Sequence, residues 1–158
     1  MGVLASDRGL IRTTLPQTSA NNCISIMGVN GCKKPVMAHG KFSVLKHKLT
    51  RYFLTGESTF HNEPIDINDA SSFHRAAWKA CRSIPNGQTR SYKWLASMAG
   101  NPLASRAAGQ SMANNRLPII IPCHRVISSN GKLGGFGKHN SMISIKRHLL
   151  KIENNSIA

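Results

Sequence analysis

The stretch LPIIIPCHRVI, residues 117–127, joins a short apolar run to the most reactive side chains of the chain. The three isoleucines at 119–121 form a continuous run, which is typical of a strand that is covered on both faces. Pro122 has no N–H to donate to a neighbouring strand, so we expect the strand to end there. Cys123 is then presented at a sharp exit from the strand, with His124 beside it.

Cys123 and His124 together suggest nucleophilic chemistry. Successive side chains of a strand point to opposite faces, so the two can approach each other, directly or through a water, only where the exit is a turn. The thiolate is the nucleophilic form of cysteine, and an imidazole with surrounding basic residues favours it. A buried structural cysteine with a satisfied polar neighbour is the alternative, and spacing alone does not decide between the two.

A histidine that acts as a base usually needs a carboxylate or a carbonyl group to fix its tautomer. Glu153 is the single carboxylate among residues 71–158, and it ends the amphipathic stretch SMISIKRHLLKIE at 141–153. This stretch predicts a helix whose apolar side chains dock on the core, namely Ile145, Leu149 and Ile152. Glu153 is therefore the expected orienting group for His124, with a surface acid as the alternative.

The region before this stretch reads as helical. Ser71 or Ser72 can cap a helix that carries Phe73, Ala77, Trp78 and Cys81 and ends before IPNG. Ser91 can cap a second helix, YKWLASMA, which Gly100 closes. A tight turn and a third helix, LASRAAGQSMAN, then follow. Two short helices joined by a glycine-containing turn suggest a helix-turn-helix, and the small residues of the second would let it approach a nucleic acid closely.

The first seventy residues read as β-rich. GVLASDRGLIRTTL predicts a hairpin, and NCISIMGVNGC predicts a further strand. SVLKHKLTRYF at 43–53 predicts a helix with one apolar face, formed by Val44, Leu45, Leu49, Tyr52 and Phe53. GESTFHNEPIDINDASS is polar and reads as a linker. We therefore predict an α+β protein with two domains, a β-rich domain with its linker at 1–70 and a mostly helical domain at 71–158.

The charge is placed unevenly between these two parts. The formal net charge is +15, of which residues 1–70 contribute +3 and residues 71–158 contribute +12. A face this basic favours a polyanion such as nucleic acid, because each neutralised phosphate releases counterions. The alternative is a solvated surface that keeps the protein soluble. Four irregularly spaced cysteines favour a reducing compartment over a disulfide framework. No membrane span or signal peptide is expected.

The glycine-rich stretch SSNGKLGGFG at 128–137 lacks a phosphate-loop lysine and does not open a helix, so no nucleotide cofactor is expected. We expect these glycines to let the main chain approach a flat substrate.

The C-terminal part of the sequence resembles a known family. PCHRVI resembles the active-site signature of the O6-alkylguanine-DNA alkyltransferases, the methylated-DNA–protein-cysteine methyltransferases. Residues 71–153 resemble the C-terminal domain of that family from end to end. The resemblance implies a DNA repair protein that flips a nucleotide out of duplex DNA and transfers the alkyl group from O6 of guanine to Cys123, once and irreversibly. O4 of thymine stays open as a second target.

The resemblance also implies residue roles. Cys123 accepts the alkyl group, and His124 acts on it through a water and is steadied by Glu153. Tyr92 turns the backbone phosphate, hydrogen-bonds the base and is the candidate proton donor, although a core aromatic would look the same. Arg106 fills the gap left by the flipped nucleotide. Asn115 holds the turn between the recognition helix and the reactive strand.

Two further groups of residues follow from the same resemblance. The helix-turn-helix enters the minor groove, and its further contacts to DNA are expected at Ser105, Ala107, Gln110 and Arg116. The substrate pocket is expected to be lined by Met112, Val126, Gly135, Phe136 and Gly137. The family further implies a monomer without a cofactor, acting in the cytoplasm, or in the nucleus of a eukaryote.

The first seventy residues match the family poorly and resemble a shortened form of its ribonuclease-H-like N-terminal domain. Some relatives bind zinc there, and Cys23, Cys32 and His39 are the candidate ligands. Their C-x8-C spacing is not a standard zinc pattern and no fourth ligand is evident, so no metal is expected.

Two other functions are compatible with parts of the sequence. A sensor that binds alkylated DNA without repairing it ranks lower, because relatives of that kind lack the cysteine. A basic helix-turn-helix regulator ranks lower too, because the helix at 103–114 offers few side chains able to read base edges beyond Arg106 and Gln110.

Overall fold

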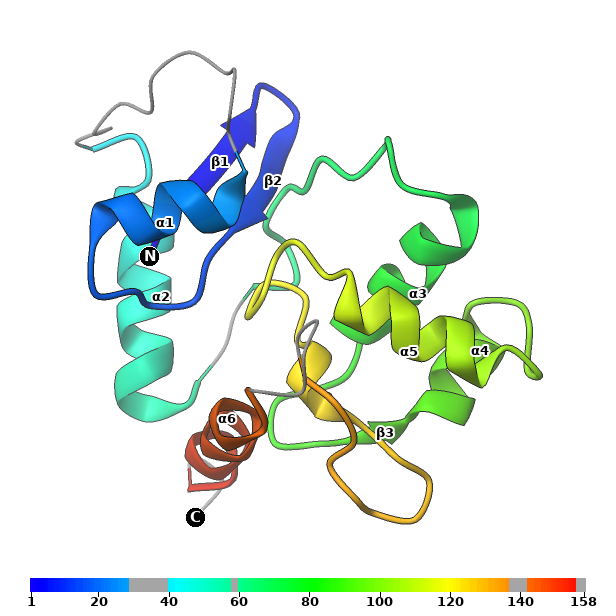
Figure 1. The fold of residues 1–158 in the computed structure, drawn as a ribbon. Coiled ribbons are helices and arrows are strands. Elements are labelled where there is room, and N and C mark those ends of the chain that lie inside the picture. The colour runs from blue at the N-terminus through cyan, green and yellow to red at the C-terminus, as the bar shows by residue number, and fades with distance from the viewer. Residues whose placement is uncertain (29–39, 58–59, 137–141, 156–158) are drawn as a thin grey trace.

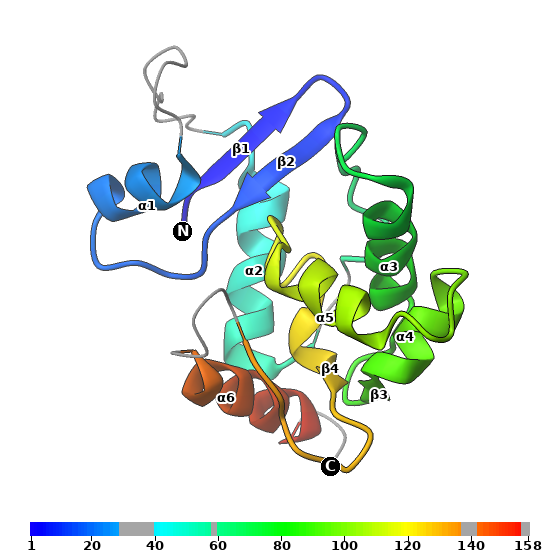
Figure 2. The same cartoon turned by 45° about the vertical axis from the view of Figure 1, so that its right-hand side comes forward.

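A computed structural model describes residues 1–28, 40–57, 60–136 and 142–155. Over these residues, helices combine with two small two-stranded sheets in an α+β arrangement, as predicted. The N-terminal hairpin with α1 and α2 lies on one side of the molecule, and α3, α4 and α5 lie on the other (Figure 1). The segment that follows α5 runs between the two sides, above α6 (Figure 2).

The predicted hairpin is confirmed as β1 (Val3–Ser6) and β2 (Gly9–Thr13), which pair antiparallel with an irregularity between Leu4 and Ala5. Ile65 bridges to Leu10 of β2, whose N–H donates to Pro64 O at 2.9 Å. Part of the predicted linker is therefore an extra edge of the hairpin. Gly9 permits this approach, because a Cβ there would lie 2.5 Å from the Pro64 carbonyl.

The strand predicted around residues 22–32 is wrong over the described part, which forms helix α1 (Ala20–Met27). The Ser19 side chain caps it by accepting a hydrogen bond from the N–H of Asn22, and a left-handed Gly28 ends it. Cys23 and Met27, four residues apart, form its buried face. The Asn-Gly turn signal at 30–31 suggested the end of a strand, but the capping serine and this spacing decide for a helix.

The helix predicted at 43–53 is confirmed as α2 (Ser43–Thr55). Leu45, Leu49 and Tyr52 are buried at the expected spacing, whereas Val44 is 66% exposed and does not belong to the buried face. Gly56 ends α2 with a φ of 75° and lies so close to α6 that a Cβ would collide with the carbonyl oxygen of Ile152.

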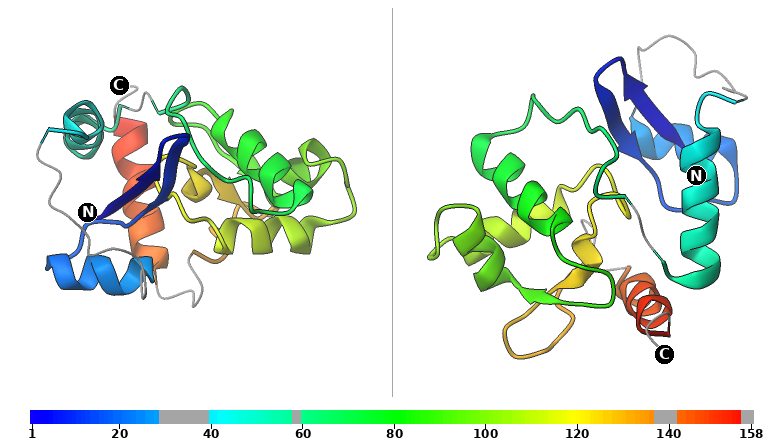
Figure 3. Two further views of the ribbon diagram at one scale, coloured as in Figure 1. Left: turned by 90° about the horizontal axis from the view of Figure 1, so that it is seen from above. Right: turned by 180° about the vertical axis from the view of Figure 1, so that it is seen from behind.

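The three predicted helices of the C-terminal part are confirmed as α3 (Ser72–Arg82), α4 (Tyr92–Met98) and α5 (Ser105–Ala113). The side chains of Ser71 and Ser91 cap the first two as expected. The indole N–H of Trp78 donates to the carbonyl oxygen of Ser111 at 2.8 Å and so joins α3 to α5. The three helices pack together, as the views in Figure 3 show.

The strand predicted at 119–121 is wrong. The segment is buried, but Ile119 has a φ of 74° and the N–H of Ile121 turns back to Leu117 O at 2.8 Å. Prolines at 118 and 122 remove two donors from this short segment, so a regular ladder cannot form around it. The burial expected for the isoleucines is therefore reached by a compact turn.

After this turn comes the 3-10 helix η1 (Cys123–Arg125) and then strand β4 (Val126–Ile127), which pairs in parallel with β3 (Arg90–Ser91). The final helix, α6 (Ile143–Asn155), packs against η1 and α2. Leu149 is buried there, and Ile145 and Ile152 pack against the same core. Of the described helices, none is long and apolar enough to cross a membrane.

Candidate active site

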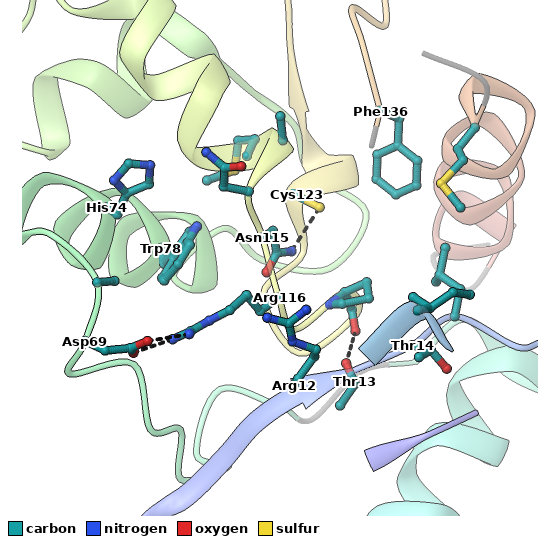
Figure 4. A pocket seen from close by; sticks show the side chains of 18 of the residues that line it. Arg12, Thr13, Thr14, Asp69, His74, Trp78, Asn115, Arg116, Cys123 and Phe136 are labelled. Atoms are coloured by element: carbon teal, nitrogen blue, oxygen red, sulfur yellow. Dashed lines mark hydrogen bonds and ion pairs between the residues drawn. The ribbon is translucent and has the colours of Figure 1, made fainter. Parts of the chain in front are cut away.

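Cys123 is the first residue of η1 and opens on a cavity of about 620 Å³. Its side chain is buried, and Sγ accepts a hydrogen bond from Nδ2 of Asn115 at 3.0 Å. Figure 4 shows this contact, with Phe136 also pointing into the cavity. Burial raises the pKa of the Cys123 thiol, while the Asn115 amide and the charge of Lys146 act in the opposite direction. The resting thiol is therefore protonated and needs a base.

Asn115 ties the turn before the cysteine together. Its Nδ2 donates both to Sγ of Cys123 and to the carbonyl oxygen of Ile121, the latter at 2.8 Å. Its Oδ1 accepts a hydrogen bond from the N–H of Leu117 at 2.9 Å. One amide therefore contacts the turn at both ends and the reactive sulfur as well, which is the place expected for a hinge residue.

His124 is paired with Glu153. Their side chains are 1% and 0% exposed, and Nε2 lies 2.7 Å from Oε1. The alternative prediction, a surface position for Glu153, is therefore wrong. A carboxylate at this distance requires a hydrogen on Nε2, which leaves the lone pair on Nδ1. Burial lowers the pKa of His124 in spite of the neighbouring Glu153, so the imidazole is neutral near pH 7 and able to accept a proton.

Glu153 is held by more than His124. Nε of Arg125 donates to Oε2 at 2.9 Å, and the hydroxyl of Tyr52 donates to Oε1 at 2.8 Å. Burial alone would raise the pKa of this carboxyl group, but hydrogen bonds from His124 and Arg125 outweigh it and bring the pKa to about 2. Glu153 is thus a fixed negative charge beside the imidazole.

Lys146 lies three residues before Leu149 on α6, and its side chain is fully buried. Nζ donates to the carbonyl oxygens of Val126 and Leu133, both at 2.6 Å, and to that of Gly135 at 3.4 Å. Burial lowers the pKa of this amine to about 8. Lys146 therefore fastens the glycine-containing loop to α6.

Sequence reasoning missed the roles of Tyr52, Arg125 and Lys146. Lys146 carried a signal, because it lies seven residues before Glu153 and thus on the same helix face. A charged residue on the buried face of an amphipathic helix indicates a polar partner inside. Tyr52 was placed on a buried face, but nothing local revealed a partner for its hydroxyl.

Tyr92 is the first residue of α4 and lies beside the loop that carries Gly135. Its hydroxyl donates to the carbonyl oxygen of Gly135 at 3.4 Å, and burial raises its pKa, with the Cys123 charge adding to the shift. A Cβ at Gly134, whose φ is 68°, would lie 3.1 Å from the Tyr92 ring, so glycine allows the loop to pass there.

The expected pocket residues fall into three groups. Met112 and Phe136 line the cavity together with Cys123. Val126 is fully buried and its carbonyl oxygen accepts from Lys146, so it lies behind the site. Gly135 is exposed on the loop, and Gly137 lies outside the described residues.

Three comparisons place the chain among known proteins. A family model described as "6-O-methylguanine DNA methyltransferase, DNA binding domain" matches residues 72–155, which is more than half of the chain. The chain belongs to this family. The resemblance noted in the sequence is thereby confirmed.

Relatives of the family cover much of the chain. The methylated-DNA–protein-cysteine methyltransferase of Mycobacterium tuberculosis is 42% identical over 114 residues, which are 72% of this chain and 66% of that protein. That of Methanosarcina barkeri is 50% identical over 91 residues, 56% of this chain and 54% of that protein. The chain thus matches about two thirds or less of the length of these curated relatives.

Solved structures of family members extend the match to the N-terminal part. The crystal structure of Mycobacterium tuberculosis OGT in complex with DNA is 34% identical, covers 98% of this chain and 86% of that chain, and has a TM-score of 0.73. The enzyme from Pyrococcus kodakaraensis, at 17% identity, covers 96% of this chain and 88% of that chain with a TM-score of 0.67, so the fold is shared beyond the similar sequences.

Against this family background, the helix α5 presents its expected DNA-contacting residues outward. Arg106, Ala107 and Gln110 are exposed and Ser105 is half-buried, whereas Ala108, Ser111 and Met112 face the core. Small residues therefore occupy much of the outer surface of α5, with Arg106 as its charged side chain.

The phosphate contact of Arg116 stays a prediction, and the structure shows an ion pair of this side chain. Its guanidinium group donates to both carboxylate oxygens of Asp69 at 2.7 Å and lies 5.8 Å from the centre of the Trp78 ring. The side chain is only 18% exposed. A carboxylate from the segment before α3 thus pairs with both terminal nitrogens of the guanidinium group.

Of the three candidate zinc ligands, the structure describes Cys23 alone. Cys23 is buried and accepts a hydrogen bond from the hydroxyl of Thr14 at 3.5 Å, and Cys32 and His39 lie outside the described residues. Within the described ranges no group of three metal-ligating side chains is present, and the cysteines there, Cys23, Cys81 and Cys123, are free thiols.

Proposed function

We propose that this chain repairs O6-alkylguanine in duplex DNA by moving the alkyl group to Cys123. One observation carries the proposal. The buried thiol of Cys123 opens on a cavity and directly precedes a histidine that is paired at 2.7 Å with a buried carboxylate. A nucleophile, a base and a group that orients the base are the parts that alkyl transfer to sulfur requires.

The reaction begins with formation of the thiolate. The thiol proton passes through a water to Nδ1 of His124, whose lone pair faces away from Glu153. No described protein atom forms a hydrogen bond with this buried nitrogen. The imidazolium that results is stabilised by the Glu153 carboxylate. The Asn115 amide and the main-chain N–H groups of Cys123 and His124 stabilise the negative sulfur.

The sulfur then attacks the alkyl carbon. An S–C bond forms, the C–O6 bond breaks, and the electron pair stays on the guanine oxygen. Tyr92 donates a proton to the departing base and regains one from solvent. Its acidity increases at the right moment, because the Cys123 charge that raises its pKa disappears as the thioether forms. A thioether is stable and nothing in the mechanism removes the alkyl group, so each molecule reacts once.

We also propose how the protein reaches its substrate. Helices α4 and α5 form a helix-turn-helix that lays the outer face of α5 in the minor groove, and the target nucleotide is flipped into the cavity. The small exposed residues of α5 and the net charge of +12 on residues 71–158 support this. The N-terminal hairpin with α1 and α2 is a shortened ribonuclease-H-like unit. The protein acts as a monomer without a cofactor in the cytoplasm or nucleus, with O4-alkylthymine as a second target.

The proposal is tested by mass spectrometry of the intact protein after incubation with a duplex that carries one O6-methylguanine. We expect a gain of one CH2 unit, located on the peptide that contains Cys123 and not on that of Cys81, and no gain in Cys123→Ala. Binding of the lesion without a gain in mass would support a sensor instead. Equal binding of damaged and undamaged duplex, again without a gain, would support a regulator.

Arg106→Ala tests the flipping step. If Arg106 fills the gap in the duplex, the single-turnover rate on duplex DNA falls about ten-fold or more, because part of the unstacking energy is no longer compensated. The rate on O6-methylguanine as a free base stays unchanged. Lys46→Ala removes an exposed charge of the same sign from α2 and serves as the control. Equal losses in the two variants would show that only the overall charge matters.

A further inference from the structure

Tyr52 lies far from Cys123 in sequence but contacts the proposed catalytic pair directly. It comes from α2 in the N-terminal part, whereas His124 belongs to η1 and Glu153 to α6. Its side chain is completely buried, and the ring packs edge-on against Phe53 and Phe60, with centroid distances of 5.3 and 5.8 Å. Aromatic neighbours hold the ring, so the position of the hydroxyl is fixed.

The hydrogen bonds around this hydroxyl allow one arrangement of protons. Tyr52 Oη lies 2.8 Å from Oε1 of Glu153 and 3.3 Å from Nε2 of His124, and Nε2 lies 2.7 Å from the same Oε1. If the hydroxyl donated to Nε2, the lone pair of that nitrogen would face a carboxylate at 2.7 Å, which is repulsive. The hydroxyl and Nε2 therefore both donate to Oε1.

We infer that Tyr52 is a positioning residue for the proposed alkyl transfer: by donating to Oε1, it fixes the carboxylate and limits how strongly Glu153 attracts the proton of His124. The catalytic purpose of this contact rests on the proposed function, whereas the contact between Tyr52 and Glu153 does not. Nη2 of Arg125 also donates to Oε1, at 3.0 Å, so the Tyr52 hydroxyl is one of three donors to this oxygen. Each donor stabilises the carboxylate charge and makes the oxygen a weaker acceptor for the others. His124 therefore stays neutral and ready to accept the thiol proton.

Other charges act on His124 as well. Glu153 favours the protonated ring, whereas burial, Arg125 on the same 3-10 turn and Lys146 on α6 disfavour it. The Cys123 thiol is the neighbouring titratable group on η1, and Tyr52 is the one that α2 contributes. Burial and the Glu153 carboxylate raise the pKa of Tyr52, so the hydroxyl remains a donor over the whole working range of pH.

Tyr52→Phe removes the hydroxyl and keeps the ring. We expect the titration midpoint of His124, followed through its ring nitrogens by NMR in the DNA-free protein, to rise by about half a pH unit or more. The acidic limb of the single-turnover rate moves to higher pH by the same amount. Leu45→Val changes the packing of the same helix about two turns before Tyr52 and should leave the midpoint in place. An unchanged midpoint in Tyr52→Phe, or an equal shift in both variants, would overturn the inference.

A second measurement covers the case in which Tyr52→Phe does not fold. The chain has two tyrosines, so 3-fluorotyrosine incorporated into Tyr92→Phe modifies Tyr52 alone. Fluorination makes the phenol a stronger donor, and the midpoint of His124 should move down; an upward shift or none contradicts the inference. Because His124 is observed without substrate, a failure of methyl transfer to Cys123 would refute the proposed function and leave this result standing.

Discussion

Glu153→Gln is expected to lower the free energy of unfolding by about 3–5 kcal/mol, the usual cost of removing one partner of a buried ion pair. Glutamine has the same shape, so the loss comes from charge. Arg125 is 4% exposed and would keep a guanidinium group with no opposite charge from position 153. Urea denaturation at pH 7 measures the change. Lys151→Gln removes an exposed charge from the same helix and should stay within about 0.5 kcal/mol of the parent.

The pH dependence of this difference follows from the pKa of Glu153. Its value of about 2 in the folded protein lies below the ~4.3 of an unfolded glutamate. The stabilisation is therefore complete above the unfolded value and is lost as the pH falls toward 2. The difference in the free energy of unfolding between the parent protein and Glu153→Gln should be constant from pH 7 to pH 5 and decrease below pH 4. A gap that widened in acid would mean that Glu153 is not a buried carboxylate.

The same variant should also slow methyl transfer, by about a hundred-fold, because a neutral amide no longer stabilises the imidazolium. The rate is measured in single turnover at a temperature where the variant is folded. A variant that loses stability but keeps its rate would show that Glu153 is structural and that His124 does not depend on it.

Lys146→Met is expected to cost about 2–4 kcal/mol, since it leaves buried carbonyl oxygens without a donor. The closest of these belong to Val126 and Leu133. Methionine fills the space of the lysine stem, so packing is largely kept. Amide hydrogen exchange should become faster in the loop at 128–136, because the amine is its link to α6.

Arg147→Met is the matched control, because Arg147 is the exposed neighbour on the same helix. If both substitutions cost the same, the buried amine does not organise the loop. The Cys123 thiol provides a second readout. The charge of Lys146 lowers its pKa, so Lys146→Met should raise that pKa and slow reaction with a thiol reagent.

Local signals were sufficient where structure depends on neighbouring residues. Ser71 and Ser91 were assigned as caps because a cap needs only the next turn of the chain. The apolar run at 119–121 predicted burial correctly and the strand wrongly, because burial depends on side chains whereas a strand also needs donors. Pro122 was read as the end of a strand, although together with Pro118 it prevents one.

The site followed the same rule. Cys123 and His124 are adjacent in sequence, and Glu153 is the single carboxylate among residues 71–158. The sequence was therefore sufficient to assign the three residues to one site. Tyr52 comes from more than seventy residues before His124, and only packing reveals its contact with Glu153. Arg116 is a second case of this kind, since its partner Asp69 is 47 positions away and no sequence pattern indicated the pair.

The close passage of Gly56 against Ile152 has a consequence for anyone who recombines this chain with its relatives. The backbone of α2 touches that of α6 where no side chain fits, next to the point where Tyr52 meets Glu153. A crossover between the two helices would join surfaces that were not shaped for each other. Functional chimeras should therefore take α2 and α6 from the same parent, although the two helices are far apart in the sequence.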